Sequence, residues 1–441
     1  MNQMTSSAPI TERRYLLPFI LVTSLFFLWA LGVNLNDILI PHLKKAFSLT
    51  DFQSSLIQSA FFGGYFLAAL PAGWLMQRLG YKKGILIGLA VCATGAFLFI
   101  PAASIRIYGF FLFALFVMAC GQCFLEVAAN PYVTILGPPE SSERRLNFAQ
   151  SFNSVGAVVT PFVGAAFILS GIEHTPAELA AMTPAQLLAY RVSEANMVKT
   201  PYLVITGIFL LVGLLIYFSG LPEVREVNHA GLPSTSRAQL GDIWSHAHLV
   251  KGIVAQFLYV GAQVGVASFI IRFAERTIPG THEKSAAHYL QFHLIGFMVG
   301  RFAGSAIMKK VAAPKLLSVF AAGSLVSLLV VLLASGAAPV WAIVLVGFFH
   351  SIMFPTIFAL SLKDLGSYTK LGSSLLVMSI VGGAIIPAVM GKISDAANIQ
   401  IAFIVPLLCH AYILYFALRG YRPAIAATAN PILGVARSEV E

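Results

Sequence analysis

Ala72-Gly73-Trp74-Leu75-Met76-Gln77-Arg78 closes one apolar segment of this chain, and Ala303-Gly304-Ser305-Ala306-Ile307-Met308-Lys309 closes another in its second half. The second stretch repeats the Ala-Gly pair and the terminal cation of the first. Glycines and prolines recur in the same order at a similar offset: Pro131 with Pro355, Gly156 with Gly382, and Pro161 with Pro387. The two halves of the chain therefore read as copies of each other, and we expect them to fold as two similar units.

The composition places these units in a membrane. Of 441 residues, 58% are hydrophobic and 10% are charged, whereas soluble proteins average about 25% charged residues. The first apolar block lacks a small-residue cleavage pattern, which indicates a retained span rather than a signal peptide. We predict an all-α polytopic membrane protein whose twelve apolar blocks each suit one crossing of the bilayer, in two six-helix repeats: 15–40, 53–77, 84–103, 108–136, 147–170, 200–220, 249–272, 285–308, 315–335, 339–362, 371–393 and 399–418.

The charges indicate topology rather than a nucleic-acid partner. The net charge is +10, but the Lys and Arg residues lie in short loops and form no basic groove. They are more numerous in the loops on the side of the termini, which predicts that both termini are cytoplasmic. The expected organisation is an N-terminal half at 1–220, a cytoplasmic linker at 221–248, a C-terminal half at 249–418 and a cytoplasmic tail at 419–441, with an outer loop at 171–199. The four cysteines lie in apolar blocks, so neither a disulfide framework nor a thiolate metal site is expected.

Two carboxylates lie inside predicted spans, Asp37 and Glu126. A charge at the centre of a membrane helix costs about 2.5 kcal/mol or more, so such residues indicate function. Polar residues at helical spacing extend from them as stripes that we expect to face one wet cavity: Asn34 with Asp37, Gln122 with Glu126 and Asn130, Gln150 with Asn153, and Gln256 with Tyr259 and Gln263.

The residue types suggest a division of labour. Amides, hydroxyls and aromatic faces suit a neutral polyhydroxylated ligand, because sugar hydroxyls both donate and accept hydrogen bonds. A buried carboxylate suits a proton, which it could take up on one side of the membrane and release on the other. The alternative for Asp37 is structural, as a helix cap or the partner of a cation. Arg301 is interpreted as serving the inner gate or helix packing rather than sugar binding, and His293 and His350 as hydrogen-bonded core or cavity histidines rather than proton relays.

The loop after the second span resembles a known family signature. Gly73-x-Leu75-x-Gln77-Arg78-x-Gly80-Tyr81-Lys82-Lys83 is similar to the major facilitator motif G-x-L-x-D-R-x-G-R-K, with Gln77 in place of the usual Asp. The resemblance implies the major facilitator fold, in which two halves rock around a substrate at the midplane. We expect Arg78, Lys82 and Arg301 at the inner gate.

Longer strings resemble the L-fucose:proton symporter (fucose permease) family, from about Tyr15 to the last span: Asn34-Leu35-Asn36-Asp37-Ile38-Leu39-Ile40-Pro41, Leu56-Ile57-Gln58-Ser59-Ala60-Phe61, Leu125-Glu126-Val127-Ala128-Ala129-Asn130-Pro131, Gln150-Ser151-Phe152-Asn153-Ser154, Tyr259-Val260-Gly261-Ala262-Gln263, Gly300-Arg301-Phe302 and Phe354-Pro355-Thr356-Ile357-Phe358. This resemblance implies that Asp37 and Glu126 act in proton coupling and sugar recognition. It also implies that Asn34, Gln150 and Trp29 line the sugar site. The chain departs from the family pattern at Ala267, where a Trp is usual, and at Phe354, where a Tyr is usual.

The predicted function is a proton-coupled symporter that imports a neutral hexose or deoxyhexose, with L-fucose as the leading candidate. The expected substrate-binding set is Trp29, Asn34, Asp37, Glu126, Asn130, Gln150, Asn153, Gln256, Tyr259, Gln263 and Phe354. No cofactor is expected beyond co-transported H⁺, and Na⁺ stays open. The alternatives are a glucose/galactose or N-acetylglucosamine transporter, coupled to either ion, then a drug exporter; a sugar sensor would carry a long appended domain, and no pattern indicates an enzyme. We expect a monomer in the bacterial inner membrane.

Overall fold

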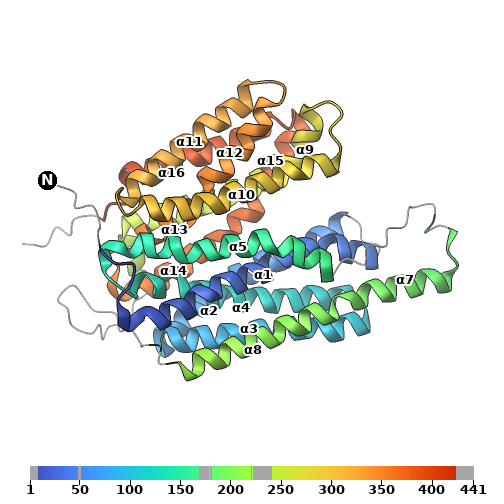
Figure 1. Cartoon of the computed structure of the whole chain (residues 1–441), viewed down its shortest axis with the longest axis horizontal. Helices are drawn as coiled ribbons and strands as arrows, with labels where there is room; N and C mark the ends of the chain where they lie inside the picture. The colour runs from blue at the N-terminus through green and yellow to red at the C-terminus, as the bar shows by residue number, and fades with distance from the viewer. Residues whose placement is uncertain are drawn as a thin grey trace, which may run out of the picture.

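The computed structural model describes residues 8–47, 51–167, 178, 181–219, 221 and 241–423, and the described elements are helical. They run side by side in one elongated bundle (Figure 1). The N-terminal half, by which we mean α1 to α8, contains the following helices: α1 (Leu16–Phe47), α2 (Asp51–Leu79), α3 (Tyr81–Ile105), α4 (Tyr108–Ile135), α5 (Ser142–Phe167), α7 (Pro184–Met197) and α8 (Lys199–Phe218).

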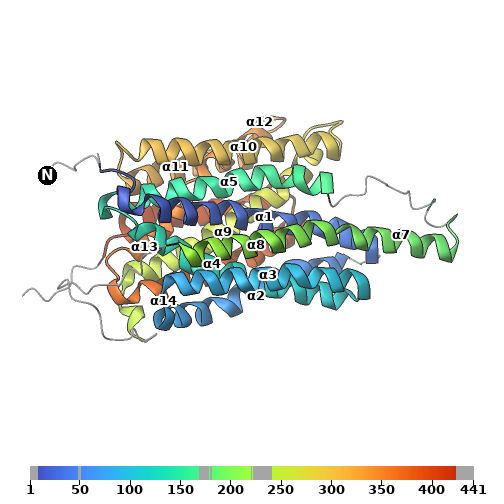
Figure 2. The ribbon, with the colours of Figure 1, turned by 60° about the horizontal axis from the view of Figure 1, so that its bottom comes forward.

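The C-terminal half, α9 to α16, has more interrupted helices. Its members are α9 (Ala247–Thr277), α10 (Glu283–Ile307), α11 (Ala313–Leu333), α12 (Ala338–His350), α13 (Met353–Leu362), α14 (Thr369–Met378), α15 (Gly382–Ala396) and α16 (Ile404–Tyr415). The pairs α12 with α13 and α14 with α15 each form one membrane span, 338–362 and 366–396. The described helices therefore make twelve crossings when α7, an extension at one end of the bundle (Figure 2), is left aside.

The twelve predicted spans are confirmed, with corrections at two of them. Ten of the described spans are long and apolar enough to cross a membrane. The other two, α5 and α10, carry polar residues such as Gln150 and Arg301 that lower their mean hydropathy. The blocks 339–362 and 371–393 were expected as single helices, but each is broken in the middle. Residues 168–170 of the fifth predicted span lie outside the described residues.

A proline accounts for the break between α12 and α13. Pro355 has no backbone N–H and so cannot donate to the carbonyl of Ser351, four residues earlier. The chain turns at Ser351 and Ile352, and the free carbonyl accepts a side chain instead, as described below. The break thus leaves a backbone carbonyl in the middle of this span free to accept a hydrogen bond from a side chain.

The two halves meet along two sets of helices. In this interface α10 packs on α5, and α14 packs on α2 and α4. Small residues permit the close approach: a Cβ added at Gly73 of α2 would lie 3.0 Å from the Ser374 Cβ and 3.1 Å from the Lys370 carbonyl oxygen of α14. The polar helices α5 and α10 therefore face each other across the interface rather than facing lipid.

Candidate functional site

Glu126 lies in the middle of α4 and is 3% exposed. Its carboxyl group hydrogen-bonds with the side chains of Tyr65 and Asn130 and interacts electrostatically with the guanidinium of Arg301. Tyr65 in turn hydrogen-bonds with Trp29. A carboxyl group with these partners is held in place deep in the membrane, yet its charge is only partly balanced there. An ionisable residue buried in a membrane helix is a candidate functional residue.

The stripe on α4 continues into a hydrogen-bonded chain that crosses to the C-terminal half. Asn130 donates from Nδ2 to the backbone carbonyl of Glu126 at 3.1 Å, and its Oδ1 accepts from Gln150 Nε2 at 2.9 Å. Arg301 then donates from Nη1 to the backbone carbonyl of Gln150 at 2.6 Å and to its Oε1 at 3.3 Å. Glu126 is thereby connected to α10 of the opposite half through three buried side chains.

Arg301 is the centre of this connection and is 3% exposed. Its Nε donates at 2.9 Å to the carbonyl of Ser351, the group that Pro355 leaves free. The guanidinium also lies 4.5 Å above the centre of the Phe297 ring, a cation–π contact on its own helix. Because the planar guanidinium offers several donors in fixed directions, it can hold the α12–α13 break and α5 at the same time.

The wall of the site in the C-terminal half is formed by α9 and α13. Tyr259 donates to the carbonyl of His350 at 2.9 Å, and its ring lies 6.3 Å from that of Phe354. Gln256 is fully buried, and neither polar atom of its amide has a hydrogen-bond partner among the described residues; the same holds for Gln122 on α4. Buried amides are normally satisfied, so two that lack partners mark places for a polar ligand or water.

The other predicted binding residues are less closely tied to this chain of contacts. Asn34 donates to the carbonyl of Ala30 on its own helix at 2.7 Å, and Gln263 is half-buried. Asn153 donates to the carbonyl of Phe26 at 3.3 Å and accepts from Arg301 at 3.5 Å. The side chain of Asp37 lies outside the described residues. The structure thus brings Trp29, Glu126, Asn130, Gln150 and Asn153 together with Arg301. Tyr65, which joins two of them, was missed by the sequence analysis.

Two of the residues expected at the inner gate make contacts within their own half. Arg78 is exposed and stacks 3.7 Å above the ring of Trp74, one turn earlier. Lys82 donates to the carbonyls of Tyr217 and Ser219 at 3.0 and 2.7 Å, at the C-terminus of α8. Both cations are therefore placed where they stabilise local structure, and a gating role for them stays a prediction.

Other residues join the halves at the end of the bundle where α5 begins and α13 ends, which we call the closed end. Glu143 forms an ion pair with Lys363 at 3.9 Å, and Asn147 donates to the hydroxyl of Thr356 at 3.0 Å. Ser305 donates to the carbonyl of Arg144 at 3.4 Å. The sequence analysis missed these pairs, because the repeat relates equivalent positions of the two halves but does not indicate which residues contact each other.

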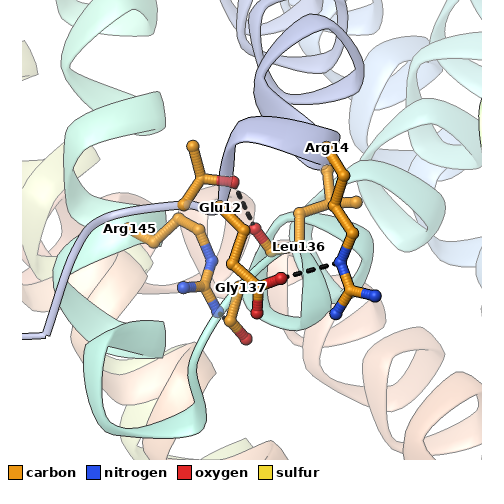
Figure 3. Close-up of polar contacts among 6 residues, drawn as sticks. Glu12, Arg14, Leu136, Gly137 and Arg145 are labelled. Atoms are coloured by element: carbon orange, nitrogen blue, oxygen red, sulfur yellow. Dashed lines mark hydrogen bonds and ion pairs between the residues drawn. The ribbon is translucent and has the colours of Figure 1, made fainter.

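Arg145, also missed, organises the chain at the closed end and is fully buried. It donates from Nε to the carbonyl of Val133 at 2.6 Å, from Nη2 to that of Thr134, and from Nη1 to that of Ile10 at 2.9 Å. Figure 3 shows it beside the turn at Leu136–Gly137, against which the segment Glu12–Arg14 lies. A cation at the C-terminus of α4 is favourable for the helix dipole, and here it also fixes the start of the described chain.

Three buried histidines lie behind the site in the C-terminal half. His350 and His410 stack with ring centroids 4.9 Å apart, and their Nε2 atoms are 2.9 Å apart. His410 Nδ1 lies 2.6 Å from the carbonyl of Pro406, which requires a proton on Nδ1 and leaves Nε2 as an acceptor. His350 is therefore the donor in the pair. His293 donates in the same way from Nδ1 to the carbonyl of Ile343 at 3.0 Å. His293 and His350, which the sequence indicates as hydrogen-bonded core or cavity histidines, both make such contacts, whereas His410 was not singled out from the sequence.

Comparison with known proteins shows the family to which this chain belongs. The sequence profile of the Major Facilitator Superfamily matches residues 22–387. The chain is 46% identical to the L-fucose-proton symporter of Escherichia coli (strain K12), covering 92% of this chain and 93% of the relative. It is 44% identical to a glucose/galactose transporter of Brucella abortus biovar 1 (strain 9-941), covering 93% and 95%. Two crystal structures of FucP are also similar to this chain: one is of a single-residue variant of the E. coli fucose:proton symporter, and the other shows the outward conformation. Each superposes with a TM-score of 0.86 at 44% sequence identity, and the match covers 93% of this chain and 100% of the solved chain. The chain belongs to the Major Facilitator Superfamily and, within it, to the family of these sugar transporters.

Proposed function

We propose that this protein is a sugar–proton symporter that imports a neutral hexose or deoxyhexose, with L-fucose as the first candidate. The observation that carries the proposal is the buried link from Glu126 through Asn130 and Gln150 to Arg301, because it joins a proton-accepting group to the interface between the halves. The names of the similar proteins support both the class of substrate and the coupling ion.

The proposed coupling follows from charge. When Glu126 is ionised, it attracts Arg301 and favours the arrangement in which α5 and α10 are held together. A proton on Glu126 removes that attraction and turns the carboxyl group from an acceptor into a donor, so that the contacts of Tyr65 and Asn130 must rearrange. A sugar that takes up the free hydrogen-bonding capacity of Gln122 and Gln256 would then stabilise the loaded carrier. Proton and sugar thus act on the same set of contacts between the halves.

The moving bodies in this proposal are the two halves, 1–220 and 249–418, connected by the segment 221–248. The larger number of Lys and Arg residues in the loops at the closed end supports a cytoplasmic location for that end, for the termini and for the linker. The protein would then be a multi-pass protein of the bacterial inner membrane. We propose a monomer as the working unit, because one chain already contains both halves of the site.

Uptake into energised membrane vesicles tests the proposal. Labelled L-fucose is supplied under an imposed pH gradient and separately under a Na⁺ gradient, with glucose, galactose and N-acetylglucosamine as competitors. We expect accumulation that follows the pH gradient and is lost in Glu126→Gln but kept in Glu275→Gln, an exposed carboxylate near the end of α9. Stronger competition by glucose or galactose would identify the protein as a glucose/galactose transporter. Uptake driven by the Na⁺ gradient would make Na⁺ the coupling ion instead of H⁺. Uphill uptake by Glu126→Gln would exclude Glu126 as the coupling group.

A further inference from the structure

A cavity of about 480 Å³ opens at the closed end, outside the site described above. It is lined from the N-terminal half by Glu140, Glu143 and Arg144, and from the C-terminal half by residues around the α10–α11 turn and the end of α13. The cavity therefore spans the seam between the two halves. Any ligand that fills it must contact both halves at once.

The charge around the cavity is predominantly positive. Lys310 and Lys315 are exposed at its wall and form no ion pair in the described part of the chain. A third lysine of the wall, Lys363, pairs with Glu143 at 3.9 Å, and Ser142 donates to the other carboxylate oxygen of Glu143 at 3.1 Å. After that pair is set aside, Arg144, Lys310 and Lys315 face a single exposed carboxylate, Glu140. The cavity thus carries two positive charges in excess.

Arg144 provides an observation that does not depend on the surface lysines. The residue is 8% exposed, and its Nε has no hydrogen-bond partner among the described residues. Its Nη1 donates to the carbonyl of Ala8 at 3.2 Å, so one side of the guanidinium is fixed by the N-terminal segment. A buried guanidinium donor without an acceptor is costly unless a ligand supplies one, and an oxyanion is the natural partner for it.

The start of α11 adds a second donor set. This 21-residue helix begins at Ala313, and its N-cap residue Ala312 provides no side-chain cap. Leu316 donates the first hydrogen bond within the helix, to the Ala312 carbonyl at 3.0 Å, so the N–H groups of Ala313 and Lys315 precede the hydrogen-bonded ladder. Uncapped N–H groups at the positive end of a long helix favour phosphate and carboxylate groups.

From these observations we infer that the cavity between Arg144 and the start of α11 binds a phosphate-bearing anion, and that the bound anion holds the closed end shut. Phosphate oxygens would accept from the Arg144 guanidinium, from the Lys310 and Lys315 ammonium groups and from the first turn of α11. Because the donors belong to both halves, binding requires the halves to be together at this end, and opening would separate the donors. An anion that binds only one state shifts the population toward that state. The source of the phosphate is either a soluble anion or the head group of an acidic lipid.

Binding is measured on the purified full-length protein, by its thermal unfolding midpoint and by titration calorimetry with inorganic phosphate at constant ionic strength. We expect a saturable rise of the midpoint and a dissociation constant about tenfold weaker in Lys315→Gln, as the loss of one charge-assisted contact predicts. Lys309→Gln is the matched control, because Lys309 is an exposed neighbour that does not line the cavity. Arg144→Gln should weaken phosphate binding more than Lys315→Gln does. If the Arg144→Gln protein does not fold, the comparison of Lys315→Gln with Lys309→Gln still tests the site.

Nanodiscs distinguish the two sources. If the ligand is a lipid head group, phosphatidylglycerol discs should raise the midpoint relative to phosphatidylcholine discs, Lys315→Gln should remove that rise, and added phosphate should have little further effect. If it is soluble, phosphate should act equally in both. No saturable effect in either, or equal losses in Lys315→Gln and Lys309→Gln, would overturn the site.

The effect on conformation is measured separately. Spin labels at Lys83 and Lys309, exposed positions near the closed end in opposite halves, should report a larger population of the short distance when phosphate is added. An unchanged distance distribution with saturated binding would overturn the gating part of the inference. None of these measurements uses sugar transport, so their failure is distinguishable from failure of the proposed symport.

Discussion

Ser373 of α14 donates a hydrogen bond to the backbone carbonyl of Val127 on α4 at 2.9 Å, across the two halves of the protein. The carbonyl is available because Pro131, four residues later, has no N–H to offer it. The second repeat uses its proline in a related way: Pro355 frees the carbonyl of Ser351, and Arg301 of the same half donates to it. Each half therefore uses its equivalent proline to free one backbone carbonyl for a side-chain donor.

Ser373→Ala should remove the donor and leave the Val127 carbonyl buried without a partner. Such a loss costs about 1–3 kcal/mol, and because the bond joins the halves, we expect the closed end to open more readily as well. The thermal unfolding midpoint and the reactivity of a cysteine at Asn147 report these two effects. The control is Ser268→Ala, which removes an exposed bond within one helix. Equal midpoints for the two variants would show that the bond to Val127 contributes nothing across the interface.

Arg301→Lys should abolish most transport although it keeps the charge. Lysine offers one ammonium group where arginine provides a planar fork, so it cannot reach the carbonyls of Gln150 and Ser351 together. We expect sugar uptake to fall at least about tenfold, the equivalent of one charge-assisted hydrogen bond. Arg272→Lys, at an exposed position on α9, should transport normally. Wild-type uptake by Arg301→Lys would mean that only the charge matters.

The membrane spans can be predicted well from the sequence, whereas the contacts between the two halves cannot. Apolar length identifies ten of the twelve crossings among the described residues, the polar α5 and α10 being the other two, and the recurring glycines and prolines reveal the repeat. The role of Pro355 is different. The sequence shows the proline, but only the fold shows that Arg301 donates a hydrogen bond to the Ser351 carbonyl that Pro355 leaves without a helical partner. Likewise Glu126 stands out as a charge in an apolar block, whereas nothing in the chain links Asn147 with Thr356.

Gly73→Ala should disturb the closed end, because a Cβ there would lie 3.0 Å from the Ser374 Cβ and 3.1 Å from the Lys370 carbonyl oxygen. The contact is with the opposite half, so the protein should still insert but favour separation of the halves at this end. We expect reduced transport and greater cysteine reactivity at Asn147. Gly63→Ala on the same helix is the matched control, because a Cβ there meets nothing within 4 Å. If both variants behave alike, general loss of helix flexibility is the cause.

Phe354→Tyr should change which sugar is preferred. The ring of Phe354 lies beside Tyr259 and is 8% exposed, so a hydroxyl added there would enter a wall that already has one tyrosine. A site hydroxyl that can pair with a sugar hydroxyl discriminates against analogues that lack it. Competition of glucose and galactose against labelled L-fucose measures the change. Phe292→Tyr, an exposed position on α10, should leave the competition profile as it is. An unchanged profile for Phe354→Tyr would place selectivity elsewhere.

The pair of His350 and His410 provides a test of whether the histidines stabilise the C-terminal half or only fill it. His410→Phe removes the acceptor and leaves the Nε2–H of His350 buried without a partner, which should cost about 1–3 kcal/mol of stability. Replacing both histidines with Phe removes donor and acceptor together, so the double variant should be less destabilised than the sum of the two single variants. The thermal midpoints of the four proteins give this coupling. If the single losses simply add, the hydrogen bond between the two Nε2 atoms contributes nothing, and the rings act only through packing. If they do not add, the hydrogen-bonded pair anchors α12 to α16 and thereby supports the break to which Tyr259 and Arg301 bind.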